Sequence, residues 1–294
     1  ELKQMFKEKV YKIALNGGMT CPNRDGHVGT GGCIFCSSQG SGDFAGSARL
    51  SIAEQIKQGK ADISSKRPVH SYIAYFQAFT NTYAPVETLR ALYMEAIADP
   101  EVKILSIATR PDCLGADVLA LLDEINHIKP VWVELGLQTI HPETSAYIRR
   151  GYELSVFEQA VKELRAIGIT VIVHTILYLP GETKDDMLDT IHYLNHMDIQ
   201  GIKLQLLHVL THTDLAADYE KHPFYIPDMQ DYIQFLGTCI AQLNPEIVIH
   251  RLTGDGAKDL LIAPLWTSNK RTVLNQLHSH LKEQDIWQGK EYYV

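Results

Sequence analysis

The sequence has little of several features that would narrow its function. Five cysteines in 294 residues are an odd and low number, which argues against a framework of disulfide bonds. The longest apolar runs, such as Thr175–Pro180, are far shorter than the roughly 20 residues of a membrane-spanning helix. No charged-then-apolar leader opens the chain, so we expect no secretory signal. These absences predict a soluble, cytoplasmic protein with no membrane contact.

Positive charge is also in short supply. The chain has 27 Lys and Arg against 35 Asp and Glu, which gives a net charge of −8. This balance provides no global attraction for nucleic acid, although a local basic patch can still bind it. Basic pairs that could form such a patch, or simply belong to solvated surface, are Lys66-Arg67, Arg149-Arg150 and Lys270-Arg271.

What the chain does contain is a regular alternation of strand and helix patterns. The apolar and β-branched runs predict strands at Val10–Leu15, Ser71–Phe76, Lys103–Ala108, Val131–Leu135, Thr170–Ile176, Gly201–Val209 and Glu246–Arg251. Apolar residues spaced by about 3.6 positions predict helices at Pro85–Ala98, Ala116–His127, Ser155–Ile167 and Thr183–Met197. This alternation predicts parallel βαβ units in a single α/β domain, residues 1–294, with a core at about 10–210 and a C-terminal extension at about 211–294.

One segment interrupts the alternation. Residues 17–46 are rich in Gly, Cys, Ser and Asp and show no periodicity, and a loop of this length is usually functional. It carries Cys21, Cys33 and Cys36 with the spacing C-x11-C-x2-C. Three thiolates suit a [4Fe–4S] cluster with one open iron. A zinc site with His27 as the fourth ligand, or unligated cysteines, remain alternatives.

The motifs of this loop resemble a known superfamily. Phe35 directly before the last cysteine, and a C-x2-C pair after the first strand, resemble the radical S-adenosylmethionine (SAM) enzymes, although their usual spacing is C-x3-C-x2-C. Cys21-Pro-Asn-Arg-Asp-Gly26 and Gly40-Ser-Gly-Asp-Phe44 are similar to the short bacterial YhcC/YtqA-type proteins, which are related to the catalytic subunit of Elongator. The resemblance covers about Tyr11 to Lys270. It implies a partial (β/α)6 TIM-like radical SAM barrel with C-terminal α/β additions, and a cluster bound by Cys21, Cys33 and Cys36.

The resemblance also implies which segments bind SAM. Tyr75–Tyr83 matches the segment that holds the SAM amino group, Val133–Gln138 with Arg149–Tyr152 matches the block that holds its carboxylate and ribose, and Val173–Glu182 matches the adenine motif. Tyr178 stands where the family usually has glycine, which we expect to reshape the adenine side. The implied cofactor-binding residues are Gln77, Ala78, Thr80, Arg110, Glu134, Gln138, Arg150, His174 and Leu179.

Structural roles remain open for these residues. Arg110 can instead pair with Asp112, and Glu134 and His174 can be satisfied core residues. The isolated Cys113 and Cys239 are expected to be small buried hydrophobes.

Substrate contacts are expected on the sixth and last strands. In Ile202–Val209, alternation is expected to send Lys203, Gln205 and His208 to one face, which in a barrel is the lumen. A hydrogen-bonded structural layer is the alternative. The candidate catalytic residues are Lys203, Gln205, His208 and, on resemblance alone, Arg251, with Asp255 and Lys270 also expected to face the substrate.

The function implied by the resemblance is radical chemistry on tRNA. Reductive cleavage of SAM would give a 5′-deoxyadenosyl radical, with an electron from an external donor such as flavodoxin or ferredoxin. The implied substrate is the wobble uridine of the tRNA anticodon loop, with conversion of 5-carboxymethylaminomethyl-uridine to 5-aminomethyl-uridine. A radical SAM reaction on a small metabolite is the runner-up, and a zinc-stabilised binding module is a third possibility.

Overall fold

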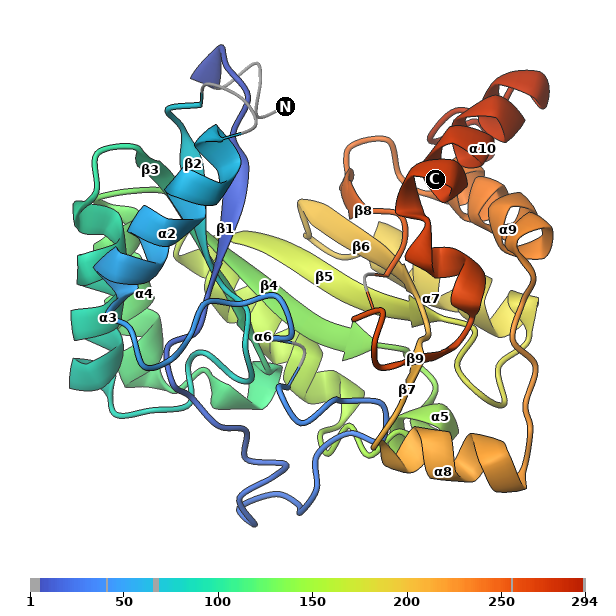
Figure 1. Ribbon diagram of the computed structural model, residues 1–294, viewed down its shortest axis with the longest axis horizontal. Coiled ribbons are helices and arrows are strands. Elements are labelled where there is room, and N and C mark those ends of the chain that lie inside the picture. Colours follow the sequence, from blue (N-terminus) through green and yellow to red (C-terminus); the bar gives the residue numbers. More distant parts are fainter. Residues whose placement is uncertain (1–5, 41, 66–68, 255, 293–294) are drawn as a thin grey trace. The chain divides into compact units, whose positions relative to one another are not determined.

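The computed structural model describes residues 6–40, 42–65, 69–254 and 256–292 (Figure 1). The chain divides into two compact units. The first unit comprises Glu1–Gly32, Gln39–Gly136 and Ser155–Ile172, and the second comprises Cys33–Ser38, Leu137–Leu154 and Val173–Val294.

Seven strands of the described chain form one sheet in the order β1-β2-β3-β4-β5-β6-β8. They are β1 (Tyr11–Leu15), β2 (Tyr72–Phe76), β3 (Val102–Thr109), β4 (Val131–Gln138), β5 (Thr170–Leu177), β6 (Gly201–Leu206) and β8 (Val248–Arg251). The pairs β1–β2, β2–β3, β3–β4 and β6–β8 are parallel. All seven predicted strands are therefore present. β6 is shorter than predicted and ends at Leu206, so His208 lies beyond the strand.

In the first unit, helices follow the strands as expected for βαβ units. They are α2 (Ile52–Ser64), α3 (Val86–Ala98), the short η1 (Pro111–Cys113), α4 (Ala116–Asn126) and, from its second residue, α6 (Leu154–Ala166). Ser51 and Glu54 begin α2 with a capping box, which satisfies otherwise orphaned amides. Helices α2, α3 and α4 lie along one side of β1–β3 (Figure 1) and bury Ile56, Leu89 and Leu122.

The second unit holds the ends of β4 and β5 together with β6, β8 and the C-terminal elements. Its helices are α5 (Pro142–Tyr147), α7 (Lys184–Asn195), α8 (Asp214–Lys221), α9 (Met229–Gln242), η2 (Leu265–Ser268) and α10 (Lys270–Glu283). The strands β7 (Val209–Leu210) and β9 (Leu261–Ala263) form a separate antiparallel pair. Helix α9 packs beside α7 and α10. None of the helices in the described ranges is long and apolar enough to cross a membrane.

Candidate active site

Cys21 lies in the loop after β1, in the first unit. Its carbonyl oxygen accepts hydrogen bonds from the amides of Arg24 (2.8 Å) and Asp25 (3.3 Å), which closes a tight turn. The amide of Thr80, after β2, donates to the carbonyl of Thr20 (3.2 Å). Cys21 is a free cysteine and partly exposed, so its thiol fits the role of a cluster ligand.

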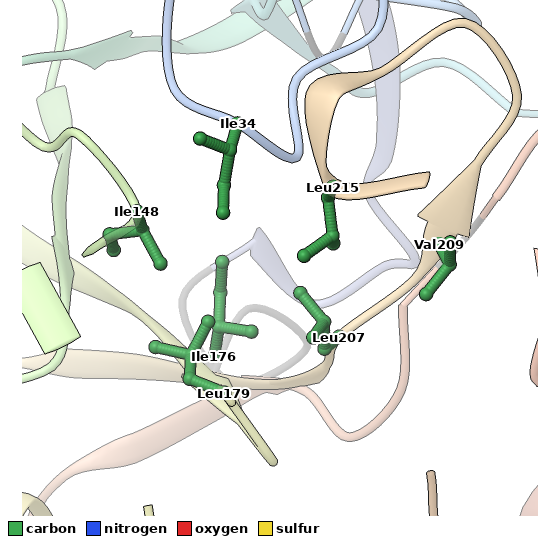
Figure 2. Close-up of a cluster of buried hydrophobic side chains, with 7 residues drawn as sticks. All are labelled: Ile34, Ile148, Ile176, Leu179, Leu207, Val209 and Leu215. Atoms are coloured by element: carbon green, nitrogen blue, oxygen red, sulfur yellow. The ribbon is translucent and has the colours of Figure 1, made fainter. Parts of the chain in front are cut away.

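Cys33 and Cys36 form a turn in the second unit. The amide of Cys36 donates to the carbonyl of Cys33 (3.0 Å), and both cysteines are partly exposed and lie outside disulfide bonds. Between them, Ile34 packs into an apolar cluster (Figure 2) whose members are Ile34, Ile148, Ile176, Leu179, Leu207, Val209 and Leu215. The amide of Ile34 donates to Ile148 (3.2 Å), and its carbonyl accepts from Leu215 (2.9 Å). One buried isoleucine thus fixes the turn that carries two of the three thiols.

The other two cysteines differ in their exposure. Cys239 is fully buried in α9, and Cys113 is partly exposed at the end of η1. Burial raises the pKa of both thiols to about 12, so both stay protonated near neutral pH. The expected burial is confirmed for Cys239, whereas for Cys113 the expectation is wrong, because its position at the end of η1 leaves it partly exposed.

The segment after β2 packs closely against the glycines of the cysteine loop. A Cβ atom at Gly42 would lie 2.5 Å from that of Ala78, and one at Gly40 would lie 2.3 Å from the ring of Phe79. Ala78 and Thr80 are almost completely buried by this packing, whereas Gln77 is partly exposed. A SAM contact therefore fits Gln77 best, and contacts by Ala78 and Thr80 stay predictions.

Arg110 forms an ion pair with Asp112, which was one of the two roles considered for it from the sequence. Its Nε and NH2 atoms donate to the two carboxylate oxygens of Asp112, at 2.9 and 2.6 Å. This bidentate geometry is the strongest form of an Arg–carboxylate contact. A role of Arg110 toward SAM stays a prediction.

Gln138, at the end of β4, has two unusual properties. Its backbone is left-handed, with φ of 69°, a conformation that costs energy for a residue other than glycine. Its side-chain Oε1 is buried and has no hydrogen-bond partner among the described residues. A buried acceptor without a donor is costly, so this position fits a ligand that supplies an N–H or O–H group, as SAM does with its amino and hydroxyl groups.

Arg150 holds the backbone on both sides of Gln138. It is 3% exposed, and its NH1 atom donates to the carbonyls of Leu137 (2.9 Å) and Thr139 (2.6 Å). Its Nε and NH2 atoms donate to the carbonyl of Tyr152 (3.2 and 3.1 Å). These four bonds make Arg150 a brace for the left-handed turn, and its predicted contact with SAM remains a prediction.

Glu134 is buried within the first unit by partners on two other strands. Lys12 Nζ on β1 lies 2.6 Å from Glu134 Oε1, and Ser106 Oγ on β3 donates to the same oxygen at 2.8 Å. The pairing explains how a carboxylate with no exposed side-chain surface is tolerated. Lys12 was not predicted as a site residue. The available signal was a charged residue in the middle of a predicted strand, in phase with Val10 and Ala14.

Side-chain contacts of Tyr178 and Leu179 hold the chain in place directly after β5. Leu179 is 2% exposed and belongs to the apolar cluster around Ile34. Tyr178 has φ of 63°, which explains why glycine is usual at this position of the family. Its hydroxyl donates to Asp231 Oδ2 on α9 (2.8 Å), and its ring packs edge-on against Phe235. His174 lies on β5 and is partly exposed.

Three of the four candidate catalytic residues lie on neighbouring strands. Lys203 on β6 pairs in register with Arg251 on β8, and Arg251 NH1 donates to Gln205 Oε1 (3.3 Å). Alternation does not support the expectation that His208 shares their face, because position 208 is out of phase with 203 and 205 and lies beyond the end of β6. Its ring instead packs against Gly254, where a Cβ would lie 2.4 Å away. Lys270 is exposed at the start of α10, and Asp255, Lys66 and Arg67 lie outside the described residues.

A further polar group was not anticipated from the sequence. His141, Asp186 and Asp189 bring potential ligand atoms within 4.8 Å of one another. His141 Nε2 lies 2.7 Å from the carbonyl oxygen of Asp186, and the Asp186 carboxylate caps α7 through Thr183. Burial raises the pKa of the adjacent Glu182. The bonds of His141 and Asp186 give these two residues structural roles at the ends of β4 and β5.

Comparison with known proteins shows the family of this chain. The family model described as "Radical SAM superfamily" matches residues 23–194, and a "Radical_SAM C-terminal domain" matches residues 199–283. Among curated proteins, YtqA of Bacillus subtilis is 44% identical over 98% of this chain and 90% of its own length. YhcC of Escherichia coli is 36% identical over 97% of this chain and 92% of its own length.

A solved structure shares the fold. The Elp3 of the archaeon Methanocaldococcus infernus, with an N-terminal deletion, aligns with a TM-score of 0.71 and 14% identity over 95% of this chain. The chain spans 64% of that structure. This likeness confirms the predicted fold class, a partial α/β barrel of the radical SAM type. The chain belongs to the radical SAM superfamily, whose enzymes use a [4Fe–4S] cluster and S-adenosylmethionine.

Proposed function

We propose that this radical SAM enzyme modifies the C5 side chain of the wobble uridine in tRNA, converting 5-carboxymethylaminomethyl-uridine to 5-aminomethyl-uridine. The observation that carries the cofactor half of the proposal is the buried, unpartnered Oε1 of Gln138 on its left-handed turn. The substrate half rests on the motif resemblance of the cysteine loop, Cys21–Gly26 and Gly40–Phe44, to the YtqA-type proteins, which are related to the catalytic subunit of Elongator.

The cluster is assigned to Cys21, Cys33 and Cys36. All three lie outside disulfide bonds and are partly exposed, and the burial of Ile34 supports a fixed orientation of the last two. When bound, the cluster supplies the electron, from a donor such as flavodoxin or ferredoxin, that cleaves SAM to methionine and a 5′-deoxyadenosyl radical. The role of the protein is to orient SAM and the substrate, because the radical itself does not discriminate between C–H bonds.

SAM binding is assigned to the ends of β4 and β5 and to the segment after β2. Gln138 would accept a hydrogen bond from SAM, with Arg150 holding the turn in place. Gln77 and His174 are partly exposed and are assigned as further contacts. Lys203, Gln205 and Arg251 would contact the substrate, and their mutual hydrogen bond and register support a common role.

A chain with a net charge of −8 must concentrate its basic residues where a polyanion is held, so tRNA binding should weaken steeply with salt. The target base must also leave its stack, which is easiest in a single-stranded anticodon loop.

The test is nucleoside mass spectrometry on tRNA from a strain that lacks the gene. We expect 5-aminomethyl-type wobble nucleosides to disappear and the carboxymethylaminomethyl form to accumulate. The wild-type gene should restore the profile, and a Cys33→Ala gene should not. An unchanged wobble profile in the deletion strain would contradict the proposal and favour a small metabolite as the substrate.

A further inference from the structure

One face of the first unit's sheet combines a charged pair with open space. The strand registers place Lys12 and Ala14 on the same face as Tyr75, Ser106 and Glu134. Toward the amino ends of the strands this face is filled by an apolar cluster of Ile73, Ile104, Trp132 and Ile172. The apolar cluster therefore closes the amino end of this face.

Toward the carboxyl ends of the strands the same face carries small residues. Ala14, Ala108 and Gly136 are each partly exposed. Ala108 and Gly136 lie on β3 and β4, which are flanked by strands on both sides, so only the sheet face can expose them. Space therefore lies above this part of the sheet, on the edge where parallel strands usually bind ligands.

Lys12 and Glu134 form the floor of that space. β1 and β4 are separated by β2 and β3, a distance of about 14 Å at the usual strand spacing, and the two side chains bridge it over the face. Lys12 Nζ and Glu134 Oε1 are 2.6 Å apart, and the Lys12 ammonium lies 4.5 Å from the centre of the Tyr75 ring. Glu134 is inaccessible, whereas the side chain of Lys12 is 31% exposed.

The exposed ammonium has the chemistry of an anion-binding group. An ammonium carries three N–H donors, and the Glu134 contact accounts for one of them. Glu134 and the electron-rich face of Tyr75 hold the positive charge in place. A small anion, such as a carboxylate at the end of a ligand, could then form a charge-assisted hydrogen bond to Lys12 from the open side.

We propose that Lys12 binds the carboxylate of the substrate's C5 side chain and that Glu134 is the positioning residue that holds Lys12. The inference rests on the proposed function, because 5-carboxymethylaminomethyl-uridine ends in a carboxylate that its product lacks. Lys12 thereby distinguishes substrate from product. The carboxylate of SAM is the competing ligand of the same chemistry.

The test measures binding to the holoenzyme with SAM but without reductant, so that no turnover occurs. Two tRNAs are compared, one with the carboxymethylaminomethyl group and one with the aminomethyl group. We expect the wild type to prefer the first by about 10-fold or more, the typical value of one charge-assisted hydrogen bond. Lys12→Arg, which keeps the charge, should retain part of this preference.

The decisive variant is Lys12→Met with Glu134→Gln, since Lys12→Met alone would leave a buried carboxylate without a cation and endanger folding. The reference is Glu134→Gln alone, which keeps the Lys12 ammonium and an amide oxygen that can still accept from it. We expect the double variant to lose the preference that Glu134→Gln alone keeps in part, and the two variants to bind SAM equally well. The matched control is Lys103→Met, also on a strand of this sheet, whose Nζ bonds only to the Pro100 carbonyl and which should keep the preference.

The outcomes separate the two proposals. If the double variant keeps the preference, only the role of Lys12 is overturned and the proposed function stands. A loss of SAM affinity beyond that of Glu134→Gln alone overturns it as well, and assigns the site to the SAM carboxylate. A wild type that binds the two tRNAs equally overturns this inference, whereas a wild type that does not convert the first tRNA when reductant is added overturns the proposed function.

Discussion

Replacement of Arg150 tests whether this residue braces the turn that carries Gln138. Arg150→Ala removes four hydrogen bonds, to the carbonyls of Leu137, Thr139 and Tyr152. The Leu137 carbonyl keeps the amide of Thr139 as a partner (2.9 Å), so two carbonyls lose the bonds described here. At about 1–3 kcal/mol for each unsatisfied buried group, the free energy of unfolding should fall by about 2–6 kcal/mol.

The consequence reaches the cofactor because Gln138 loses its left-handed geometry. The melting temperature should fall by about 3–10 °C, and SAM affinity should fall by about 10-fold or more, as for loss of one hydrogen bond to a charged group. Thermal melting and equilibrium dialysis of SAM, both on anaerobically reconstituted protein, measure the two effects.

The neighbouring Arg149 supplies a matched control. Its side chain is 40% exposed and pairs with Asp214 at the surface, so Arg149→Ala should cost under about 1 kcal/mol. If Arg150→Ala lowers the melting temperature and SAM affinity no more than Arg149→Ala does, the brace does not exist.

Three further predictions concern the thiols, the Ile34 anchor and Glu182. Cys21→Ala, Cys33→Ala and Cys36→Ala should each abolish bound iron, whereas Cys113→Ala and Cys239→Ala should keep it; iron retained in any of the first three refutes the ligand assignment. Ile34→Ala should cost about 2–4 kcal/mol of stability and lower iron occupancy, while Ile128→Ala, at a 54% exposed position, should do neither. Burial raises the pKa of Glu182 above 4.5, so the folded state binds this proton more tightly and stability should fall as pH rises through the interval above 4.5. Glu182→Gln should remove that dependence in a pH series of denaturation curves, and an unchanged slope would contradict it.

Much of the architecture follows from sequence patterns because buried parallel strands impose a strong signal. Apolar runs such as Thr170–Ile176 and Val131–Leu135 are typical of strands that are buried on both faces. The structure differs from the predictions mainly at the ends of the strands. The predicted end of β6 is wrong, for a physical reason. The apolar residues continue past Leu206, but β6 ends there, and position 208 is out of phase with 203 and 205, so alternation gives no reason to place His208 on their face.

Less of the candidate site could be predicted from the sequence. Arg150 could be singled out, but its bonds to the carbonyls around Gln138 depend on a left-handed backbone that no local pattern indicates. The departure at Tyr178 was visible, whereas its attachment to Asp231 on α9 depends on a contact 53 residues away. Lys12 was missed for the same reason, since its partner Glu134 is 122 residues further along the chain.

The central claim is tested most directly by a single reaction. Anaerobically reconstituted protein is incubated with SAM, dithionite and tRNA that carries 5-carboxymethylaminomethyl-uridine, and the nucleosides are analysed by mass spectrometry. We predict that 5′-deoxyadenosine and 5-aminomethyl-uridine both appear, and that neither forms with the Cys33→Ala variant. Formation of 5′-deoxyadenosine with the wobble nucleoside unchanged would contradict the account.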